Sequence, residues 1–343
     1  MKKILVTGGC GYIGAHTVVD LIENNVEVVS IDDNSKSTTR LLDGIEKITG
    51  KRINNYKVDL KDYAAVKQVF EENQDIDGII HFAAYKAVGE SVELPLYYYE
   101  NNLIGLVNVL KNVEAYKIPS FVFSSSCTVY GSPDEIPVTE QTPTKPAESP
   151  YGATKQMAET ILKDYAKVHP ETKVVLLRYF NPVGAHPSIE IGELPLGRPQ
   201  NLVPAVTQTA IGKLPQMVVY GDDYETTRDG SCLRDFIHVS DIAHAHTLAI
   251  TYVEAGKAKT NCEIFNLGSG NGVTVLEVIK AFEKVSGVKL NYVIGPRRAG
   301  DVVAIYANNQ HAVSELGWNL QYNLDDMMST AWKWELKLKE EGF

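Results

Sequence analysis

The sequence predicts an α/β fold with a doubly wound parallel sheet, followed by a smaller C-terminal mixed α/β substrate domain. Three observations predict it. Short apolar runs alternate with amphipathic stretches of helical length, a glycine-rich turn joins the first run to the first such stretch, and glycine and proline recur from 182 to 215. We therefore expect a nucleotide-binding domain over 1–180 and a second domain over 181–343. Segments near 236–266 are expected to return to the first sheet.

The elements follow from the spacing of the apolar residues. Continuous apolar runs predict strands over 3–7, 27–32, 78–82, 120–125 and 173–178. Apolar residues three and four apart predict helices over 12–23, 64–72, 103–116 and 151–168, and later over 241–254, 275–286 and 323–339. Helices between successive strands favour parallel pairing.

Composition excludes several classes of function. The net charge of −10 gives no field that attracts nucleic acid or an anionic membrane, and no apolar stretch reaches the ~18 residues of a membrane span. The four cysteines are scattered without a Cys-x-x-Cys pair, so we expect neither disulfides nor a structural zinc site, and a cytoplasmic location fits best. His244 and His246 are two apart on an expected helix and point to different faces, so no metal site is expected.

The glycine-rich turn carries the first functional signal. Gly9, Gly11 and Gly14 form a Gly-x-Gly-x-x-Gly pattern directly after the first strand, and Gly8 precedes it. In Rossmann-type folds such glycines allow a tight turn, a close approach of a pyrophosphate, and close packing of helix on strand. The helix N-terminus then offers unpaired N–H groups to the anion.

An acidic residue ends the second expected strand. Asp32 lies 18 residues beyond Gly14, where a carboxylate binds both hydroxyls of an adenosine ribose and repels a 2′-phosphate. This placement favours NAD over NADP. The alternative is a tight turn with an unrelated surface aspartate.

Three further residues suggest proton transfer coupled to oxidation. The strand over 120–125 runs into Ser126, and Tyr151 and Lys155 lie four apart at the start of an expected helix, on one face. A tyrosine is a poor base at neutral pH, but a nearby ammonium group stabilises the phenolate. Tyr151 could then remove a hydroxyl proton while Ser126 positions the reacting oxygen. Alone, the Tyr-x-x-x-Lys spacing is common and equally fits an ordinary amphipathic helix.

Seven motifs together resemble the extended short-chain dehydrogenase/reductase family, and within it the epimerases of UDP-hexoses. They are Val-Thr-Gly-Gly-Cys-Gly-Tyr-Ile-Gly (6–14), His-Phe-Ala-Ala (81–84) with Lys-Ala-Val-Gly-Glu-Ser (86–91), Phe-Ser-Ser-Ser (123–126), Ser-Pro-Tyr-Gly (149–152), Leu-Arg-Tyr-Phe-Asn-Pro-Val-Gly-Ala-His-Pro (177–187), Arg-Asp-Phe-Ile-His-Val (234–239) and Arg-Arg-Ala-Gly-Asp (297–301). The resemblance covers nearly the whole chain. The runs 178–187 and 297–301 are the most specific to the epimerases.

The resemblance implies an NAD-dependent isomerase of galactose metabolism that interconverts UDP-galactose and UDP-glucose by transient oxidation at sugar C4. It assigns catalysis to Ser126, Tyr151 and Lys155. The expected NAD-binding residues are Gly8, Gly11, Tyr12, Ile13, Gly14, Asp32, Asn34, Ser37, Asp59, Leu60, Phe82, Ala83, Ala84, Lys86, Asn101, Ser124, Tyr151, Lys155 and Tyr179. The expected UDP-sugar-binding residues are Lys86, Ser126, Tyr151, Tyr179, Phe180, Asn181, Asn201, Leu202, Val218, Tyr220, Arg234, Arg298, Asp301 and Ile305. The family also implies a homodimer through the segments around 103–116 and 156–168.

The chain departs from the family pattern at two places. Ser231-Cys232-Leu233 replaces the usual Gly-Thr-Gly, and the loop over 224–229 is one residue longer. Ile305 stands where a large aromatic residue is typical of enzymes restricted to glucose and galactose, and a small residue of those that accept N-acetyl sugars. We hypothesise a slow second activity on UDP-N-acetylglucosamine and UDP-N-acetylgalactosamine.

Two alternatives remain from the sequence. A nucleotide-sugar 4,6-dehydratase begins with the same oxidation, but the family's dehydratases carry an Asp-Glu pair where this chain has Cys127-Thr128-Val129. A non-catalytic NAD-sensing regulatory protein would be expected to lack Tyr151 or Lys155, and both are present.

Overall fold

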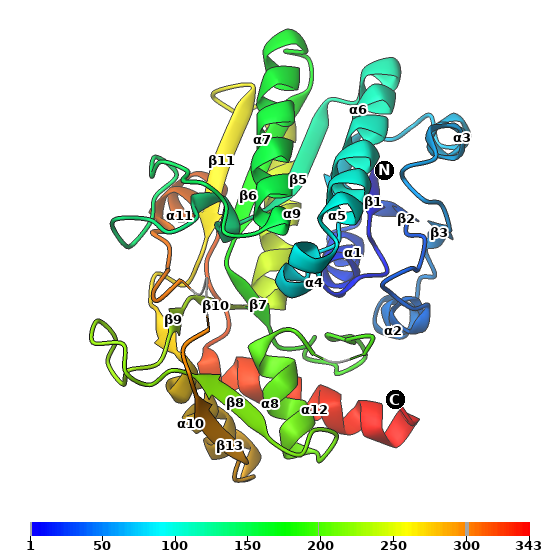
Figure 1. Cartoon of the computed structure of the whole chain (residues 1–343). Coiled ribbons are helices and arrows are strands. Elements are labelled where there is room, and N and C mark those ends of the chain that lie inside the picture. Colours follow the sequence, from blue (N-terminus) through cyan, green and yellow to red (C-terminus); the bar gives the residue numbers. More distant parts are fainter. Residues whose placement is uncertain (1, 198, 299–301) are drawn as a thin grey trace.

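The centre of the molecule is a seven-stranded sheet with the order β11-β6-β5-β4-β1-β2-β3, shown in Figure 1 for a computed structural model that describes residues 2–197, 199–298 and 302–343. All neighbouring strands are parallel. The strands are β1 (Lys3–Thr7), β2 (Glu27–Ile31), β3 (Asn54–Tyr56), β4 (Gly78–His81), β5 (Ser120–Ser126), β6 (Lys173–Tyr179) and β11 (Cys262–Leu267). The order reverses at β1, so a ligand crevice is expected at the carboxyl ends of β1 and β4.

Helices cover both faces of this sheet, because successive strand residues point to opposite sides. Val6, Ile80 and Val122 face the core under α1 (Tyr12–Glu23), α2 (Arg40–Thr49) and α9 (Val239–Glu254). Their chain neighbours Leu5 and Ile79 face the core under α3 (Tyr63–Glu72), α6 (Gly105–Tyr116) and α7 (Pro150–Val168). The doubly wound α/β fold predicted from the sequence is confirmed.

The predicted helices lie within two residues of their observed bounds, and the differences have local causes. The helix expected from 103 is preceded by a π-helical turn, η1 (Glu100–Ile104), in which the buried Asn102 accepts the backbone N–H of Tyr85. The helix α2, which carries Gly44 in its interior, was not predicted from the sequence. A Cβ at Gly44 would stand 2.3 Å from the carbonyl oxygen of Glu190, so the packing requires glycine there.

The second part of the chain lies below the carboxyl edge of the sheet in Figure 1. Three two-stranded sheets pair β7 (Asn181–Val183) with β10 (Phe236–His238), β8 (Met217–Tyr220) with β13 (Tyr292–Gly295), and β9 (Leu233–Arg234) with β12 (Val273–Thr274). The helices α8 (Leu202–Ala210), α10 (Val275–Ser286) and α12 (Leu324–Glu341) close a separate apolar core around them.

Later segments also complete the first sheet. β11 is its edge strand beside β6, α9 packs against α1, and α11 (Gln310–Leu316) lies against β11. The remaining short helices, α4 (Val88–Glu93), α5 (Pro95–Tyr99) and the 3₁₀ turn η2 (Cys127–Tyr130), follow β4 and β5. Within the described ranges, no helix combines the length and the apolarity needed to cross a membrane.

Candidate active site

The glycine turn after β1 packs its backbone closely against neighbouring backbone. Gly8 has a φ of +75°, and a Cβ there would lie 2.9 Å from the amide nitrogen of Ala83. A Cβ on Gly14 would lie 2.1 Å from the carbonyl oxygen of Gly8, so α1 packs here with no room for a side chain. Gly11 is the N-cap residue of α1 and provides no side-chain cap. The N-terminus of the helix can therefore receive an anion.

The Asp32 carboxylate is fixed beside this turn. Its Oδ2 accepts the N–H of Cys10 at 3.0 Å, and its Oδ1 accepts the N–H of Asn34 at 2.9 Å and the hydroxyl of Ser37 at 2.8 Å. Burial raises the pKa of Asp32, while these hydrogen bonds act in the opposite direction. The carboxylate and the glycine turn form a cradle that suits the ribose and pyrophosphate of a dinucleotide.

The other expected cofactor residues surround the carboxyl ends of β1, β3 and β4. Phe82 follows β4 and donates its N–H to Thr7, and Ala83 and Ala84 come next. Leu60, in the loop after β3, lies against Gly105 of α6. Lys86 pairs with Glu193 at 3.3 Å, and its Nζ lies 5.8 Å from the ring centre of Tyr12. The remaining members are Ile13 in α1, Asp59, which pairs with Lys61, and Asn101, which donates to Asn102.

Ser126, Tyr151 and Lys155 come together where β5 meets α7. Ser149 caps α7 by accepting the N–H of Gly152 at 3.2 Å, and Pro150 occupies the first turn, which places Tyr151 at the very start of the helix. A hydrogen bond with Ser126 acts on the Tyr151 hydroxyl, but burial dominates and raises the pKa of Tyr151 well above its ordinary value.

Lys155 lies against β5 and is only 4% exposed. Its Nζ donates to the carbonyl oxygen of Ser124 at 2.6 Å and lies 6.0 Å from the ring centre of Tyr151. Burial lowers the pKa of Lys155 to about 7, against the charge of Glu159. Next to it, the hydroxyls of Ser124 and Tyr179 are hydrogen-bonded.

The expected sugar-nucleotide residues form three groups. Asn181, which follows Phe180 after β6, donates its N–H and its Nδ2 to the carbonyl oxygen of Asp235, the neighbour of Arg234. Arg234 donates to the carbonyl oxygen of Leu233 at 3.0 Å, and the same oxygen accepts the N–H of Ile305. The guanidinium of Arg298 lies 5.4 Å from the ring centre of Tyr220, two residues after Val218 on β8.

Asn201 forms the third group, directly before Leu202 at the start of α8. It donates to Glu193 at 2.8 Å, the carboxylate that also binds Lys86. Asp301 lies outside the described residues. Arg234 and Ile305 thus share the carbonyl oxygen of Leu233, and Asn201 and Lys86 share the carboxylate of Glu193.

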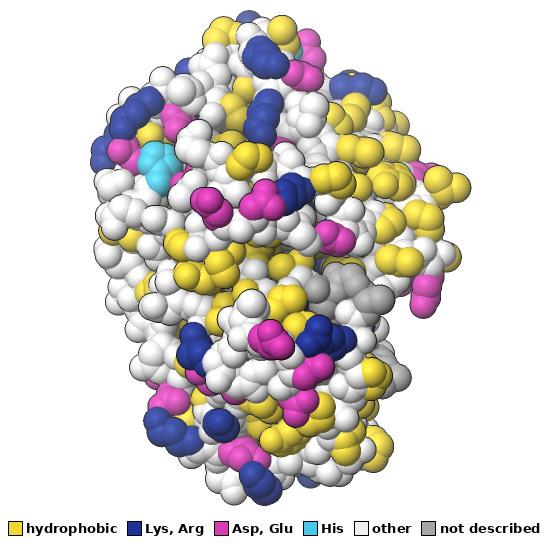
Figure 2. Space-filling model, turned by 60° about the vertical axis from the view of Figure 1, so that its left-hand side comes forward, with side chains coloured by type: hydrophobic (Ala, Val, Ile, Leu, Met, Phe, Trp, Pro, Cys, Tyr) yellow, Lys and Arg dark blue, Asp and Glu magenta, His cyan; other side chains and the backbone are white. Residues whose placement is uncertain are grey.

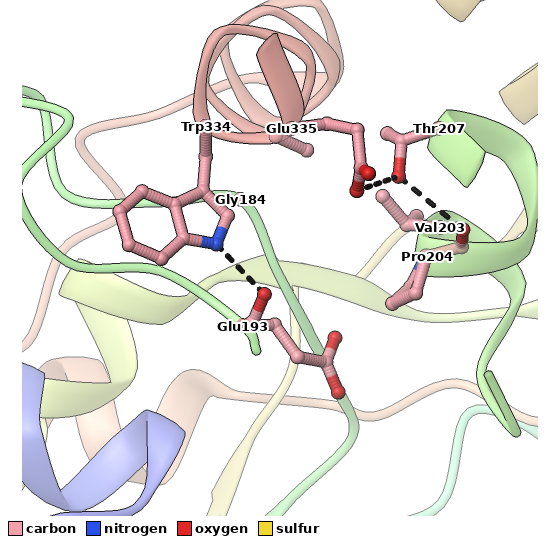
Figure 3. A pocket seen from close by; sticks show the side chains of 8 residues that line it. Gly184, Glu193, Val203, Pro204, Thr207, Trp334 and Glu335 are labelled. Carbon is pink, nitrogen blue, oxygen red and sulfur yellow. Dashed lines mark hydrogen bonds between the residues drawn. The ribbon is translucent and has the colours of Figure 1, made fainter. Parts of the chain in front are cut away.

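The small cavity drawn in Figure 3 is not the substrate site. It lies between α8 and α12, where Trp334 donates to the carbonyl oxygen of Glu193 at 2.7 Å and Thr207 donates to Glu335 at 3.2 Å. Its volume of about 20 Å³ holds roughly one water molecule. A sugar nucleotide needs far more space.

The comparisons with known proteins show the family of the chain. A family model described as GDP-mannose 4,6 dehydratase matches residues 5–331. The chain is 46% identical over 336 residues to UDP-glucose 4-epimerase 2 of Arabidopsis thaliana, which covers 97% of this chain and 95% of that protein. It is 48% identical over 332 residues to UDP-glucose 4-epimerase of Bacillus subtilis, with 97% and 96% covered. The chain belongs to the UDP-glucose 4-epimerase family.

Crystal structures of this epimerase family share the fold. The UDP-glucose 4-epimerase of Bifidobacterium longum, in complex with NAD⁺ and UDP, matches with a TM-score of 0.94 and 45% identity, over 100% of both chains. The one from Stenotrophomonas maltophila, with bound NAD and formylated UDP-arabinopyranose, matches with 0.96 and 41%, over 100% of both chains. The family resemblance inferred from the motifs is confirmed.

Sequence reasoning missed a second layer of this epimerase-family site. Asp235 is fully buried, and its carboxylate accepts the backbone N–H of Ser269 at 2.7 Å and that of Ala307 at 3.1 Å. These bonds connect three separate segments next to Arg234. Arg178 and Glu159 form a buried ion pair behind Lys155. One signal was available: an arginine inside the apolar run 173–179 needs a buried partner.

The described residues on the face drawn in Figure 2 form no continuous basic patch that would bind a polyanion. Among the described residues there, basic and acidic side chains are interspersed, and hydrophobic side chains gather on the upper right flank. In the part of the chain that the structure describes, no three His, Cys, Asp or Glu side chains form a metal-binding group.

Proposed function

We propose that this chain interconverts UDP-galactose and UDP-glucose by transient oxidation at sugar C4, with tightly bound NAD as its cofactor. The observation that carries the proposal is the meeting of Ser126, Tyr151 and Lys155 at the end of β5, beside the glycine turn and Asp32. Membership of the epimerase family, at 46% identity to a named UDP-glucose 4-epimerase, supports it.

The residues of the chain fit NAD. Backbone atoms of neighbouring residues occupy the space that a Cβ would need at Gly8 and Gly14. The first turn of α1 has no side-chain cap, so its backbone N–H groups would bind the pyrophosphate. Asp32, positioned by Cys10 and Ser37, would hold the ribose hydroxyls. When bound, NAD supplies a nicotinamide ring that accepts a hydride from sugar C4 and returns it to the opposite face.

The chain's own task is to move one proton and position one oxygen. Tyr151 would take the proton of the 4-hydroxyl and give it back. Its hydroxyl is hydrogen-bonded to Ser126, so both residues would contact the same sugar oxygen. The ammonium group of Lys155, 6.0 Å from the ring centre of Tyr151, would stabilise the phenolate. Ser126 would hold the reacting oxygen.

Arg234 and Arg298 would bind the diphosphate, since a planar guanidinium matches phosphate oxygens. Asn181 and Asn201 would orient the sugar and the base from β7 and α8. Ile305 is 5% exposed and is joined to Leu233, next to Arg234. Its intermediate size supports a slow second activity on N-acetyl UDP-sugars.

The family model described as GDP-mannose 4,6 dehydratase matches most of the chain, but the relatives at 46% and 48% identity are UDP-glucose 4-epimerases. The segment Cys127–Tyr130 after β5 carries no carboxylate for dehydration, and the residues required for turnover are all in place. The epimerase is therefore the function that we propose.

The remaining expectations concern organisation. We infer a nucleotide-binding domain over 1–180 that α9 and β11 complete, a UDP-sugar domain in the rest of 181–343, and a cytoplasmic location. We also infer a homodimer, with the partner packing along α6 and α7. Exposed apolar side chains on and before these helices support it; they include Leu96 at 80%, Val92 at 61% and Met157 at 45% exposure. A molar mass measured by light scattering tests the dimer.

The decisive experiment for the function incubates the purified chain with UDP-galactose, without added cofactor, and follows the sugar by proton NMR. Formation of UDP-glucose supports both the epimerase and the retained NAD. A product with a new methyl resonance would indicate the dehydratase instead. No change, even after NAD is added, would favour the regulatory alternative.

A further inference from the structure

A buried ion pair lies one helical turn behind the catalytic residues. Arg178 of β6 donates Nε to Oε1 of Glu159 at 2.8 Å and Nη2 to Oε2 at 2.6 Å. Both side chains are 3% exposed. Removing one partner of such a pair is strongly destabilising, because the other charge is then left buried and unpaired. The pair is absent from the set of residues that bind or react in the proposed function.

The sheet holds this pair from all sides. Ser125, Arg178 and Asn266 are register neighbours on β5, β6 and β11. Ser125 donates its hydroxyl to Glu159 at 2.7 Å. Arg178 also donates to the hydroxyl of Tyr130 at 3.0 Å, and Tyr130 in turn donates to Asn266 at 2.6 Å. The Glu159 carboxylate therefore has one fixed position relative to β5.

Glu159 shares α7 with the catalytic residues. It lies four residues after Lys155 and eight after Tyr151, so the three side chains share one face of the helix. Lys155 in turn reaches the carbonyl oxygen of Ser124, next to the Ser125 that binds Glu159. The two contacts hold α7 against β5 on successive turns.

The electrostatic setting of Lys155 gives the pair a further role. The Nζ of the buried Lys155 lies 4.8 Å from the ring centre of Phe123 and 6.0 Å from that of Tyr151. Its charge acts on His81 of β4, and the charge of Glu159 acts on it. Among these neighbours Glu159 supplies the negative charge. Burial would raise the pKa of Glu159. Arg178, the hydroxyl of Ser125 and Lys163, whose Nζ lies 3.0 Å from Oε2, bring this pKa below its ordinary value.

We propose that Glu159, held by Arg178 and Ser125, is a positioning residue that keeps Lys155 charged and seated on Ser124 beside Tyr151. The proposal rests on the proposed function for its kinetic consequence. It adds an acidic group to the proton chemistry: the carboxylate behind the lysine opposes the cost of burying the ammonium group.

The test is Glu159→Gln, which keeps the shape and removes the charge. The titration of Lys155 is measured in the purified protein with its retained cofactor, by following the ¹³Cε resonances of labelled lysine. The Lys155 resonance is the one that disappears in Lys155→Met. We expect the midpoint to fall by about one pH unit. The alkaline limb of the kcat profile should move to lower pH by a similar amount. An unchanged midpoint would overturn the proposal, even if the rate fell at every pH.

Two control variants separate charge from packing. Glu159→Asp keeps the charge, so its Lys155 midpoint should stay with that of the parent protein; a fall equal to that of Glu159→Gln would overturn the proposal. Glu335 of α12 is another buried glutamate, and it pairs with Lys213 at 2.9 Å. Glu335→Gln should leave the Lys155 midpoint unchanged. A fall there as well would mean that the shift is non-specific, which also contradicts the proposal.

If Glu159→Gln does not fold, the pair Glu159→Gln with Arg178→Gln leaves no unpaired buried charge, and its midpoint should fall in the same direction. If the parent protein epimerises no sugar, the proposed function fails, but the Lys155 titration still decides the proposal about Glu159.

Discussion

The Nζ of Lys155 lies 2.6 Å from the carbonyl oxygen of Ser124, and this bond joins α7 to the carboxyl end of β5. The sheet thereby sets the distance between the helix that carries Tyr151 and the strand that ends at Ser126. The position of Tyr151, the base that we propose, thus depends on the central sheet rather than on a loop. Sites built on helices and strands are held more precisely than sites on loops.

Tyr151→Phe tests the proton acceptor. The variant keeps the ring and loses the hydroxyl, so we expect kcat to fall by about 10²–10⁴-fold, the usual contribution of a general base. Bound NAD should be retained at the parent level. Tyr165→Phe on the same helix is the matched control, since Tyr165 faces the stacked ring of His169 rather than the site. If Tyr151→Phe turned over at the parent rate, another residue would be the base.

Gly14→Ala tests the packing of the glycine turn. Its Cβ would meet the carbonyl oxygen of Gly8 at 2.1 Å, so α1 must move away from β1. We expect a loss of about 1–3 kcal/mol in the free energy of unfolding, together with loss of the bound nucleotide. Gly89→Ala is the control, because its nearest neighbour is 3.8 Å away. Thermal unfolding and the absorbance of released nucleotide measure both effects; equal behaviour of the two variants would contradict the account.

His244 of α9 and Asp20 of α1 form an ion pair, with His244 Nδ1 at 3.1 Å from the carboxylate. Its hydrogen bond to Asp20 raises the pKa of His244 above 6.5. A raised histidine pKa means that the stabilisation is fully present below about pH 6.5 and disappears as the pH rises through the folded value. His244→Gln should therefore lower Tm more at about pH 6 than at about pH 8. Since the pair is partly exposed, the effect is under about 1 kcal/mol, and a pH-independent difference would refute it.

Ile305→Gly tests the substrate range. The side chain is 5% exposed beside Leu233, and its removal opens space next to Arg234. We expect the rate on UDP-N-acetylgalactosamine to rise relative to that on UDP-galactose. Proton NMR of both reactions gives the ratio, and Ile305→Val, which removes a single methylene, is the matched control. An unchanged ratio would remove the basis for the second activity. The variant also costs about 2–5 kcal/mol in stability, so Tm is measured beside it.

Local sequence was sufficient for the parts of the site that depend on one segment. The glycine turn, Asp32 at the end of β2 and the start of α7 at Ser149 each follow from residues close together in the chain, and the structure has them where they were expected. The sheet order, by contrast, depends on long-range pairing. β11 lies beside β6 although about eighty residues separate them. From the sequence we expected only that segments near 236–266 return to the first sheet, without a position for the strand.

The unpredicted parts are those that depend on contacts between segments. Glu159 shows no local signal beyond its spacing from Lys155, and its partners Ser125 and Arg178 come from two different strands. Asp235 is similar, since it binds Ser269 and Ala307 from loops far along the chain. Burial of a charge is decided by tertiary packing, which the apolar pattern of a single strand does not encode.

The measurement that tests the central claim most directly is the fate of the hydrogen on sugar C4. UDP-galactose is converted in D₂O, and the UDP-glucose formed is examined by NMR for deuterium at C4. If Tyr151 handles only the hydroxyl proton and the carbon-bound hydrogen stays with the enzyme's cofactor, C4 of the product carries no solvent deuterium. Deuterium at C4 would show that a protein or solvent acid delivers this hydrogen, and would contradict the transient-oxidation account.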